Sequence, residues 1–284
     1  MGSLILAYPN RTDEATLSGG SWTNRPLTCL QTKLLSDQAR STDLLLTSTK
    51  FKVDLGRDRN IALISLINHN LSLDATYRIT ASATPGFETL LLDTGWKSVW
   101  PAIWSTYSLE WEDDNFWTGQ FTQEQIDGNT ANLIEILSAM VFARYLWIEI
   151  NDTGNTDGYV AIGRLFLSNV WQPDSGVAYG GSLYYEDNTQ IDTSLAEVEF
   201  FDERPKYRVT IFALNDMSSD ETYNRALELQ RQAGISKEVF LVADTNDVAN
   251  IIRRSYLGRM RKLSPLEHRD FSAHGTQYEI KEII

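Results

Sequence analysis

Residues that could catalyse a reaction or bind a transition metal are scarce in this sequence. It contains three histidines, His69, His268 and His274, and a single cysteine, Cys29. His268 and His274 are six residues apart, which is not the i, i+4 spacing that puts two ligands on one face of a helix. His69 lies in Asn68–Asn70, directly after an apolar run. At this position we expect a hydrogen-bonded turn residue more than a catalytic base. A lone cysteine forms no disulfide within the chain and is by default a small buried side chain.

Acidic and aromatic residues are clustered between residues 110 and 117. The carboxylates are Glu110, Glu112, Asp113 and Asp114, and they lie beside Trp111 and Trp117. Such mixtures occur in glycosidase clefts, but catalysis there needs two carboxyl groups facing each other across roughly 5–10 Å. Neighbours in sequence seldom do so, and a solvated acidic loop is expected. No phosphate-binding loop, nucleophile elbow or dinucleotide fingerprint occurs either. We therefore predict no catalytic residue and no cofactor.

The segment from Asn151 to Gly158 has oxygen-bearing side chains at every second position. These are Asn151, Thr153, Asn155 and Asp157, followed by Gly158. Alternating oxygens before a glycine are typical of calcium loops. Only Asp157 among them is charged, however, and the bidentate glutamate expected later is missing. The segment predicts a hairpin loop and no metal site.

Five of the eight tryptophans lie within 22 residues, at positions 96, 100, 104, 111 and 117. A segment with this many aromatic residues buries a large apolar surface area wherever it packs. We favour packing in the core or at a subunit contact, with Trp104, Trp111 and Trp117 as candidate contact residues. The alternative is an exposed platform for a sugar ring or for a neighbouring subunit.

Charge is distributed unevenly along the chain, whose formal net charge is −13. From Pro205 onward there are 12 Lys and Arg against 11 Asp and Glu, which leaves 13 against 27 in residues 1–204. An acidic front disfavours nucleic acid and anionic membranes as the main partner. The basic cluster consists of Arg253, Arg254, Arg259, Arg261 and Lys262. We predict that it contacts acidic surface on a neighbouring subunit.

The first part of the chain has the pattern of β structure. Residues 60–67 form a near-continuous apolar run, as expected of a strand covered on both faces, and residues 75–82 alternate strictly. Residues 145–150 and 159–167 predict two further strands on either side of the Asn/Gly-rich loop. Many short strands with little helical periodicity predict a β-sandwich, which we place at residues 1–200.

The pattern changes after residue 200. A strand is expected at residues 207–214, followed by a capping box from Ser218 to Glu221 that opens a helix ending at Gly234. A strand over 238–243, a short helix from Asn246 to Arg253, and strands from Ser255 complete the pattern. Residues 201–284 are therefore predicted to be a small α+β unit.

The order of these segments resembles the galactose-binding-like jelly rolls of the discoidin type. The segments are Phe51–Gly56, Arg59–Leu63, Ile67–Leu71, Ala75–Arg78, Tyr145–Ile150 and Tyr159–Leu167. With Trp171–Pro173 and the tyrosine- and glycine-rich Val177–Ser182, they look like the version found in tail-associated proteins of siphophages and prophages. The resemblance covers roughly residues 45–185.

This resemblance implies a non-enzymatic virion structural protein of a phage tail tip or baseplate. It would assemble into a homo-oligomeric ring, bind other phage tail proteins, and be made in the cytoplasm of the bacterial host. The fold also occurs in carbohydrate-binding modules, so recognition of host surface glycans is the alternative. No apolar run approaches the roughly 20 residues needed to span a bilayer, so no membrane span is expected.

Overall fold

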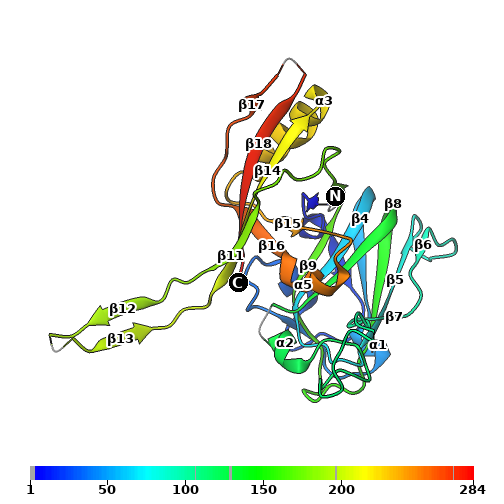
Figure 1. Ribbon diagram of the computed structural model, residues 1–284. Helices are drawn as coiled ribbons and strands as arrows, with labels where there is room; N and C mark the ends of the chain where they lie inside the picture. Colours follow the sequence, from blue (N-terminus) through cyan, green and yellow to red (C-terminus); the bar gives the residue numbers. More distant parts are fainter. Residues whose placement is uncertain (1–3, 106, 128–129, 196, 271) are drawn as a thin grey trace. The chain divides into compact units, whose positions relative to one another are not determined.

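The computed structural model describes residues 4–105, 107–127, 130–195, 197–270 and 272–284. The chain divides into two compact units, neither of them continuous in sequence. Unit 2 comprises Pro9–Val170 and Val248–Arg253, and unit 1 comprises Met1–Tyr8, Trp171–Asp247 and Arg254–Ile284. Both units are built mainly of antiparallel strands (Figure 1). The prediction of a mainly β chain with a β-sandwich is confirmed.

The boundary between the units differs from the one expected at residue 200. The main stretch of the sandwich unit is Pro9–Val170, and residues 171–200 belong with the C-terminal strands. The reason is strand pairing: β11 (Ser182–Glu186) pairs with β14 (Tyr207–Met217), and β1 (Ile5–Ala7) pairs with β15 (Val239–Val242). Non-local pairing of this kind leaves no local signal in the sequence.

Unit 2 is a β-sandwich in which two long strands, β4 and β8, contribute to both layers. Its elements are η1 (Thr12–Glu14), β2 (Thr16–Ser18), η2 (Leu27–Gln31), β3 (Ala39–Arg40), α1 (Leu46–Thr49), β4 (Phe51–His69), β5 (Thr76–Ser82), β6 (Leu92–Asp93), β7 (Lys97–Ser98), α2 (Gln123–Asp127), β8 (Asn132–Asn151) and β9 (Ala161–Ser168). The first part of β4 lies between β2 and β8, and its last part lies between β8 and β9. The β4–β8 register shifts between Asp54 and Arg59, around Gly56 at φ +73°, and again between Ile61 and Leu63.

The core of unit 2 follows from this pairing. Residues 61–67 of β4 are all buried, as their continuous apolar run predicted. Phe51, Leu146 and Leu165, from three different strands, are fully buried in one apolar cluster. Burying side chains of this size contributes about 1.5–3 kcal/mol each.

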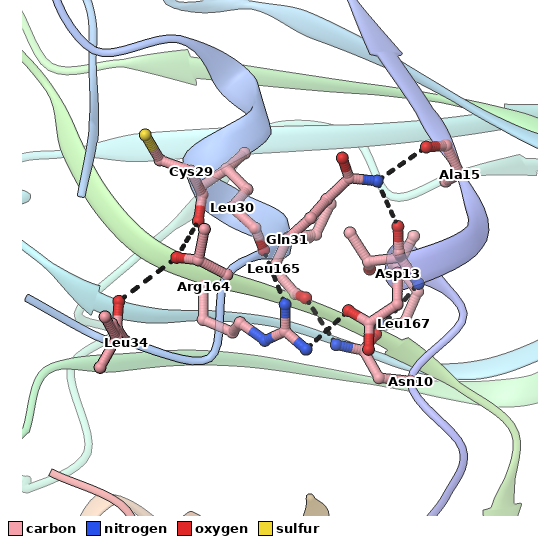
Figure 2. A network of polar contacts seen from close by, with 12 residues as sticks. Asn10, Asp13, Ala15, Cys29, Leu30, Gln31, Leu34, Arg164, Leu165 and Leu167 are labelled. Carbon is pink, nitrogen blue, oxygen red and sulfur yellow. Dashed lines mark hydrogen bonds and ion pairs between the residues drawn. The ribbon is translucent and has the colours of Figure 1, made fainter. Parts of the chain in front are cut away.

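A buried arginine connects the N-terminal segment of unit 2 to the strand β9. Arg164 is fully buried, and its guanidinium lies 2.6 Å from Oδ1 of Asp13, which is partly exposed (Figure 2). Asn10 donates to the carbonyl of Leu165 at 3.1 Å and accepts from the amide of Leu167 at 3.1 Å. Gln31 of η2 donates to two carbonyls of the same segment, at Thr12 and Ala15. These polar groups hold irregular backbone against the sheet.

Unit 1 is a second antiparallel sheet. Besides β1, β11, β14 and β15, this sheet contains β16 (Ser255–Met260), β17 (Glu267–His268) and β18 (His274–Glu282). Unit 1 also has a separate two-stranded hairpin of β12 (Gln190–Thr193) and β13 (Glu199–Asp202), and the helical segments α3 (Ser219–Glu221), η3 (Thr222–Leu227) and α4 (Glu228–Ala233). The order in the sheet is β10-β1-β15-β16-β18-β14-β11, where β10 is Val170–Trp171. The short helices η4 (Val248–Asn250) and α5 (Ile251–Arg254) connect β15 to β16, and all of their residues except Arg254 belong to unit 2. One face of the sheet packs its apolar side chains against the helical segments.

The predicted capping box is half present. Ser218 accepts a hydrogen bond from the amide of Glu221 at 3.2 Å, as expected. The Glu221 carboxylate does not return to the cap. It accepts from the indole of Trp171 at 3.0 Å and from the amide of Asp174 at 3.1 Å. A side chain expected to stabilise its own helix thus binds a different segment.

None of the helices in the described ranges has both the length and the apolar character that crossing a membrane requires.

Replacing Arg164 by alanine should destabilise unit 2 by roughly 3 kcal/mol, because Asp13 and the Leu30 carbonyl lose a buried partner. Chemical denaturation followed by circular dichroism measures this. Arg57→Ala is the matched control, since Arg57 is exposed, and it should change stability by less than about 0.5 kcal/mol. Equal effects of the two substitutions would contradict a stabilising role for the buried arginine.

Candidate functional site

The aromatic segment between β7 and α2 is anchored through Trp100. This side chain is 1% exposed, and its indole donates to the carbonyl of Leu71 at 3.2 Å. Gln120 donates to the carbonyl of Trp100 at 2.8 Å, and Phe121 packs against the indole with ring centroids 6.1 Å apart. Both ends of the segment are therefore attached to the core of unit 2.

Beyond this anchor, the chain presents a compact group of aromatic rings to solvent. Trp111 and Trp117 are 72% and 76% exposed. Together with Phe116 they contact each other pairwise, with ring centroids 5.1–5.5 Å apart and mostly edge-to-face. We call these three residues the aromatic platform. Its rings fix one another's orientation while leaving much of the two indoles accessible.

The backbone under the aromatic platform depends on a glycine. Gly119 has φ +62°, and a Cβ added there would lie 2.3 Å from the carbonyl oxygen of Trp104. Its own carbonyl accepts from the amides of Ile103 and Trp104, at 2.8 and 3.1 Å, and its amide donates to Asn115 at 2.7 Å. These bonds connect the two halves of the segment.

The structure divides the tryptophans that the sequence grouped together. Trp100 is buried, and Trp104 is half-buried against Phe121, at 5.0 Å between centroids. For these two the core-packing expectation is right. Trp111 and Trp117 are exposed within this chain, so core packing does not account for them, and their role as subunit contacts stays a prediction. The alternative of an exposed platform describes them better.

The acidic residues near the aromatic platform are exposed, as expected for a solvated loop. This holds for Glu110, Glu112, Asp113 and Asp114. Asp113 accepts from the backbone amide of Glu110 at 2.8 Å, which closes a tight turn. The platform therefore lies among carboxylate oxygens that can accept hydrogen bonds from a ligand.

The Asn151–Gly158 segment connects β8 to β9, as predicted. Asp152 accepts from the amide and the hydroxyl of Ser72, the amide at 3.0 Å. Asn155 donates to Asp152 at 2.9 Å and to the carbonyl of Asn70 at 2.8 Å. Asp152 and Asn155 thus hold the neighbouring loop at residues 70–72, which supplies the Leu71 carbonyl that anchors Trp100.

His69 is the buried last residue of β4, where it pairs with Ile162, and it accepts a hydrogen bond from the turn that follows. Its Nδ1 accepts from the amide of Leu71 at 3.3 Å, which places the proton on Nε2. Nε2 is buried and has no partner in the described part of the chain. Burial lowers the pKa of His69 to about 3, so the ring is a poor base at neutral pH.

The basic cluster does not form one free surface. Arg253 belongs to unit 2, and the other four residues belong to unit 1. Within unit 1, Arg254 pairs with Asp247 at 2.9 Å, near a cavity of about 650 Å³. The contact of the cluster with a neighbouring subunit stays a prediction.

Two of the basic residues share one carboxylate. Arg261 and Lys262 lie 3.0 and 3.1 Å from Glu279, and Arg261 also pairs with Glu186. Arg259 is exposed and forms no ion pair within the described ranges.

Sequence reasoning missed a β-hairpin that continues β11 and β14 away from the sheet of unit 1 (Figure 1). Its strands are β12 and β13, and we call residues 187–206 the arm. The arm exposes large apolar side chains: Ile191 57%, Leu195 109%, Val198 53%, Phe200 61% and Phe201 56%. The apolar stretch from Val198 to Phe201 was the available signal, but its exposure could not be known from the sequence.

Comparisons with known proteins give similarity at the level of solved structures. A scan of protein-family models finds no match, and neither does a search of curated proteins. The chain is similar to the family 32 CBM from C. perfringens NanJ in complex with galactose, at 16% identity and a TM-score of 0.38, over 58% of this chain and 99% of that one. It is similar to CBM32-1 from a family 31 glycoside hydrolase of Clostridium perfringens, at 11% identity and a TM-score of 0.37, over 57% of this chain and 99% of that one.

The chain is also similar to part of a larger enzyme. A family 89 glycoside hydrolase from Clostridium perfringens matches at 18% identity and a TM-score of 0.37, over 57% of this chain and 15% of the enzyme. These values describe a partial likeness, which does not extend to what those proteins bind or hydrolyse.

Stability of unit 2 should fall on acidification in a way that depends on His69. Its pKa is about 3 when folded against an ordinary value of 6.5, so below pH 6.5 the unfolded chain binds a proton that the folded chain does not. The free energy of unfolding should drop by on the order of 1 kcal/mol per pH unit from pH 6.5 towards pH 4.

Substituting His69→Gln should remove this part of the pH dependence in denaturant titrations. His268→Gln, at an exposed position, is the control and should leave the slope as in the wild type. Parallel pH profiles for the wild type and His69→Gln would show that His69 does not contribute.

Proposed function

We propose that unit 2 is a non-catalytic module that binds carbohydrate through the aromatic platform. The observation that carries this proposal is the exposure of Trp111 and Trp117 on an anchored loop. Sugar rings present flat C–H faces that stack on indoles, and the bound ring displaces poorly held water from apolar surface.

The surroundings of the aromatic platform favour a neutral glycan. Exposed carboxylates at residues 110–114 can accept hydrogen bonds from sugar hydroxyls. They would repel sugars that carry carboxylate or sulfate groups. The same carboxylates follow one another on one exposed turn, which suits binding better than hydrolysis, since hydrolysis needs an opposed pair.

Preorganisation supports binding as well. The rings of Trp111, Phe116 and Trp117 hold one another in place, so little side-chain entropy is lost when a ligand settles on them. Gly119 and its backbone hydrogen bonds keep the loop in one conformation.

A glycan array followed by calorimetry should detect binding of neutral oligosaccharides to the full chain. The double substitution Trp111→Ala and Trp117→Ala should weaken binding more than about tenfold, because both stacking surfaces are lost. Its stability should change by less than about 1 kcal/mol, since both side chains are exposed. Trp96→Ala, a partly exposed tryptophan outside the aromatic platform, is the matched control and should bind normally.

Retained affinity in the double variant would move the site elsewhere. A wild-type chain that binds none of the arrayed glycans would contradict the carbohydrate function.

A second candidate function is that of a structural subunit of a phage tail tip or baseplate, which the arm favours. An exposed apolar hairpin on an otherwise packed unit is typical of proteins that are completed by a neighbour. In this function the chain would be made in the cytoplasm of the bacterial host and carried in the virion, bound to itself and to other tail proteins. The two functions are compatible, because a tail tip can hold a glycan-binding module.

Antibodies against the chain should label the tail tip of purified phage particles in electron micrographs. If mass spectrometry finds no copy of the protein in purified particles, this second function is contradicted, and the glycan-binding proposal is unaffected.

A further inference from the structure

The arm lacks the packing that would stabilise its conformation. Among the residues that the structure describes, β12 and β13 pair only with each other, from Gln190 with Asp202 to Thr193 with Glu199. An isolated two-stranded hairpin is marginally stable in water, and here every residue of both strands is exposed. A fixed conformation of the arm therefore requires a covering surface.

Apolar side chains lie on both faces of the arm. Ile191 is opposite Phe201 on one face, and Phe200 is opposite Asp192 on the other. Whichever face of the arm meets another surface, it can therefore bury apolar side chains there.

The outer part of the arm is acidic. Residues 190–202 contain Asp192, Glu197, Glu199 and Asp202 and no lysine or arginine. Asp202 pairs with Arg204 near the root of the arm, at 3.3 Å. Anionic lipid and nucleic acid would be repelled by this charge, and a protein surface that combines cations with apolar groups would be attracted.

A surface of this kind exists on unit 1 itself. Arg259, Lys281 and Tyr184 belong to one row across β16, β18 and β11, in which the β14 member, Val209, is fully buried. They lie on the face opposite the helical segments, because Met260 and Ile280, in the next row, pack into the helix-covered core.

The same face carries an excess of positive charge. Arg259, Arg261, Lys262 and Lys281 are opposed there by Glu186 and Glu279. We call these four cations, with the half-exposed Tyr184, the cationic face. The edge strand β11 bounds it, and β11 exposes Leu183 and Tyr185 and pairs on one side with β14 in the described structure.

We propose that the arm of one copy of this chain docks on the cationic face of a second copy. The arm cannot reach the cationic face of its own copy while β12 continues the direction of β11, since residues 186–194 carry its end about 26 Å away from the sheet. Arm and cationic face are different surfaces, so the contact is heterologous and generates either a closed ring or a filament. This inference rests on the second proposed function, that of an assembly subunit, and is independent of glycan binding.

Light scattering of the full chain over a concentration series tests the contact. The wild type should form oligomers that dissociate as salt rises, because the contact is partly ionic. Glu197→Arg with Glu199→Arg on the arm should weaken assembly more than about tenfold, and so should Arg259→Glu with Lys262→Glu on the cationic face. Phe200→Ser with Phe201→Ser should do the same by removing the apolar part.

Mixing the two charge-reversed variants gives the sharpest result. The unaltered acidic arm of the face variant meets the unaltered cationic face of the arm variant, and the two reversed surfaces also match. The mixture should therefore assemble, although each variant alone is monomeric. Asp113→Arg with Asp114→Arg, an exposed acidic pair in unit 2, is the matched control and should assemble like the wild type.

A monomeric wild type at all concentrations would overturn the proposal, as would variants that assemble normally or a mixture that stays monomeric. If the chain is monomeric in solution yet present in phage particles, the second-copy contact fails while the assembly function stands. Circular dichroism confirms that each variant is folded.

Discussion

Two strands of unit 2 are too long to belong to one flat sheet, and the rest of the unit depends on how they bend. β4 and β8 pair along most of their length, with register shifts on either side of residues 59–61. The first part of β4 pairs with β2 and β8, and its last part pairs with β8 and β9. Because both layers share these strands, their interior faces close on a single apolar cluster.

Buried polar groups then attach the irregular segments to this frame. Arg164 and Asp13 hold the N-terminal segment against β9, and Asp152 holds the loop around Ser72 after β4. That loop presents the Leu71 carbonyl to Trp100, which anchors the aromatic segment. The position of the exposed aromatic platform thus follows from a chain of hydrogen bonds that begins at the β8–β9 connection.

Unit 1 is arranged differently. Helical segments cover one face of its sheet, and the other face carries the residues of the cationic face. The buried Arg208 satisfies Glu282 through its backbone amide and guanidinium, at 3.0 and 2.8 Å. Tyr256 donates to Thr210 at 2.6 Å in the same interior. These satisfied polar groups fix the register of β14, β16 and β18, and the register decides which cations share a face.

Features that depend on local periodicity and turn chemistry could be predicted from the amino-acid sequence. The buried run at 61–67, the alternating strand at 76–82, the β8–β9 loop, the Ser218 cap and the exit at Gly234 are all local patterns. Which distant strands pair could not be predicted, and this pairing places residues 171–200 and β1 in unit 1. The tertiary structure also separated Trp100 from Trp111 and exposed the arm. Whether an apolar side chain is buried depends on which distant segments pack against it, and the residues next to it in sequence do not specify those segments.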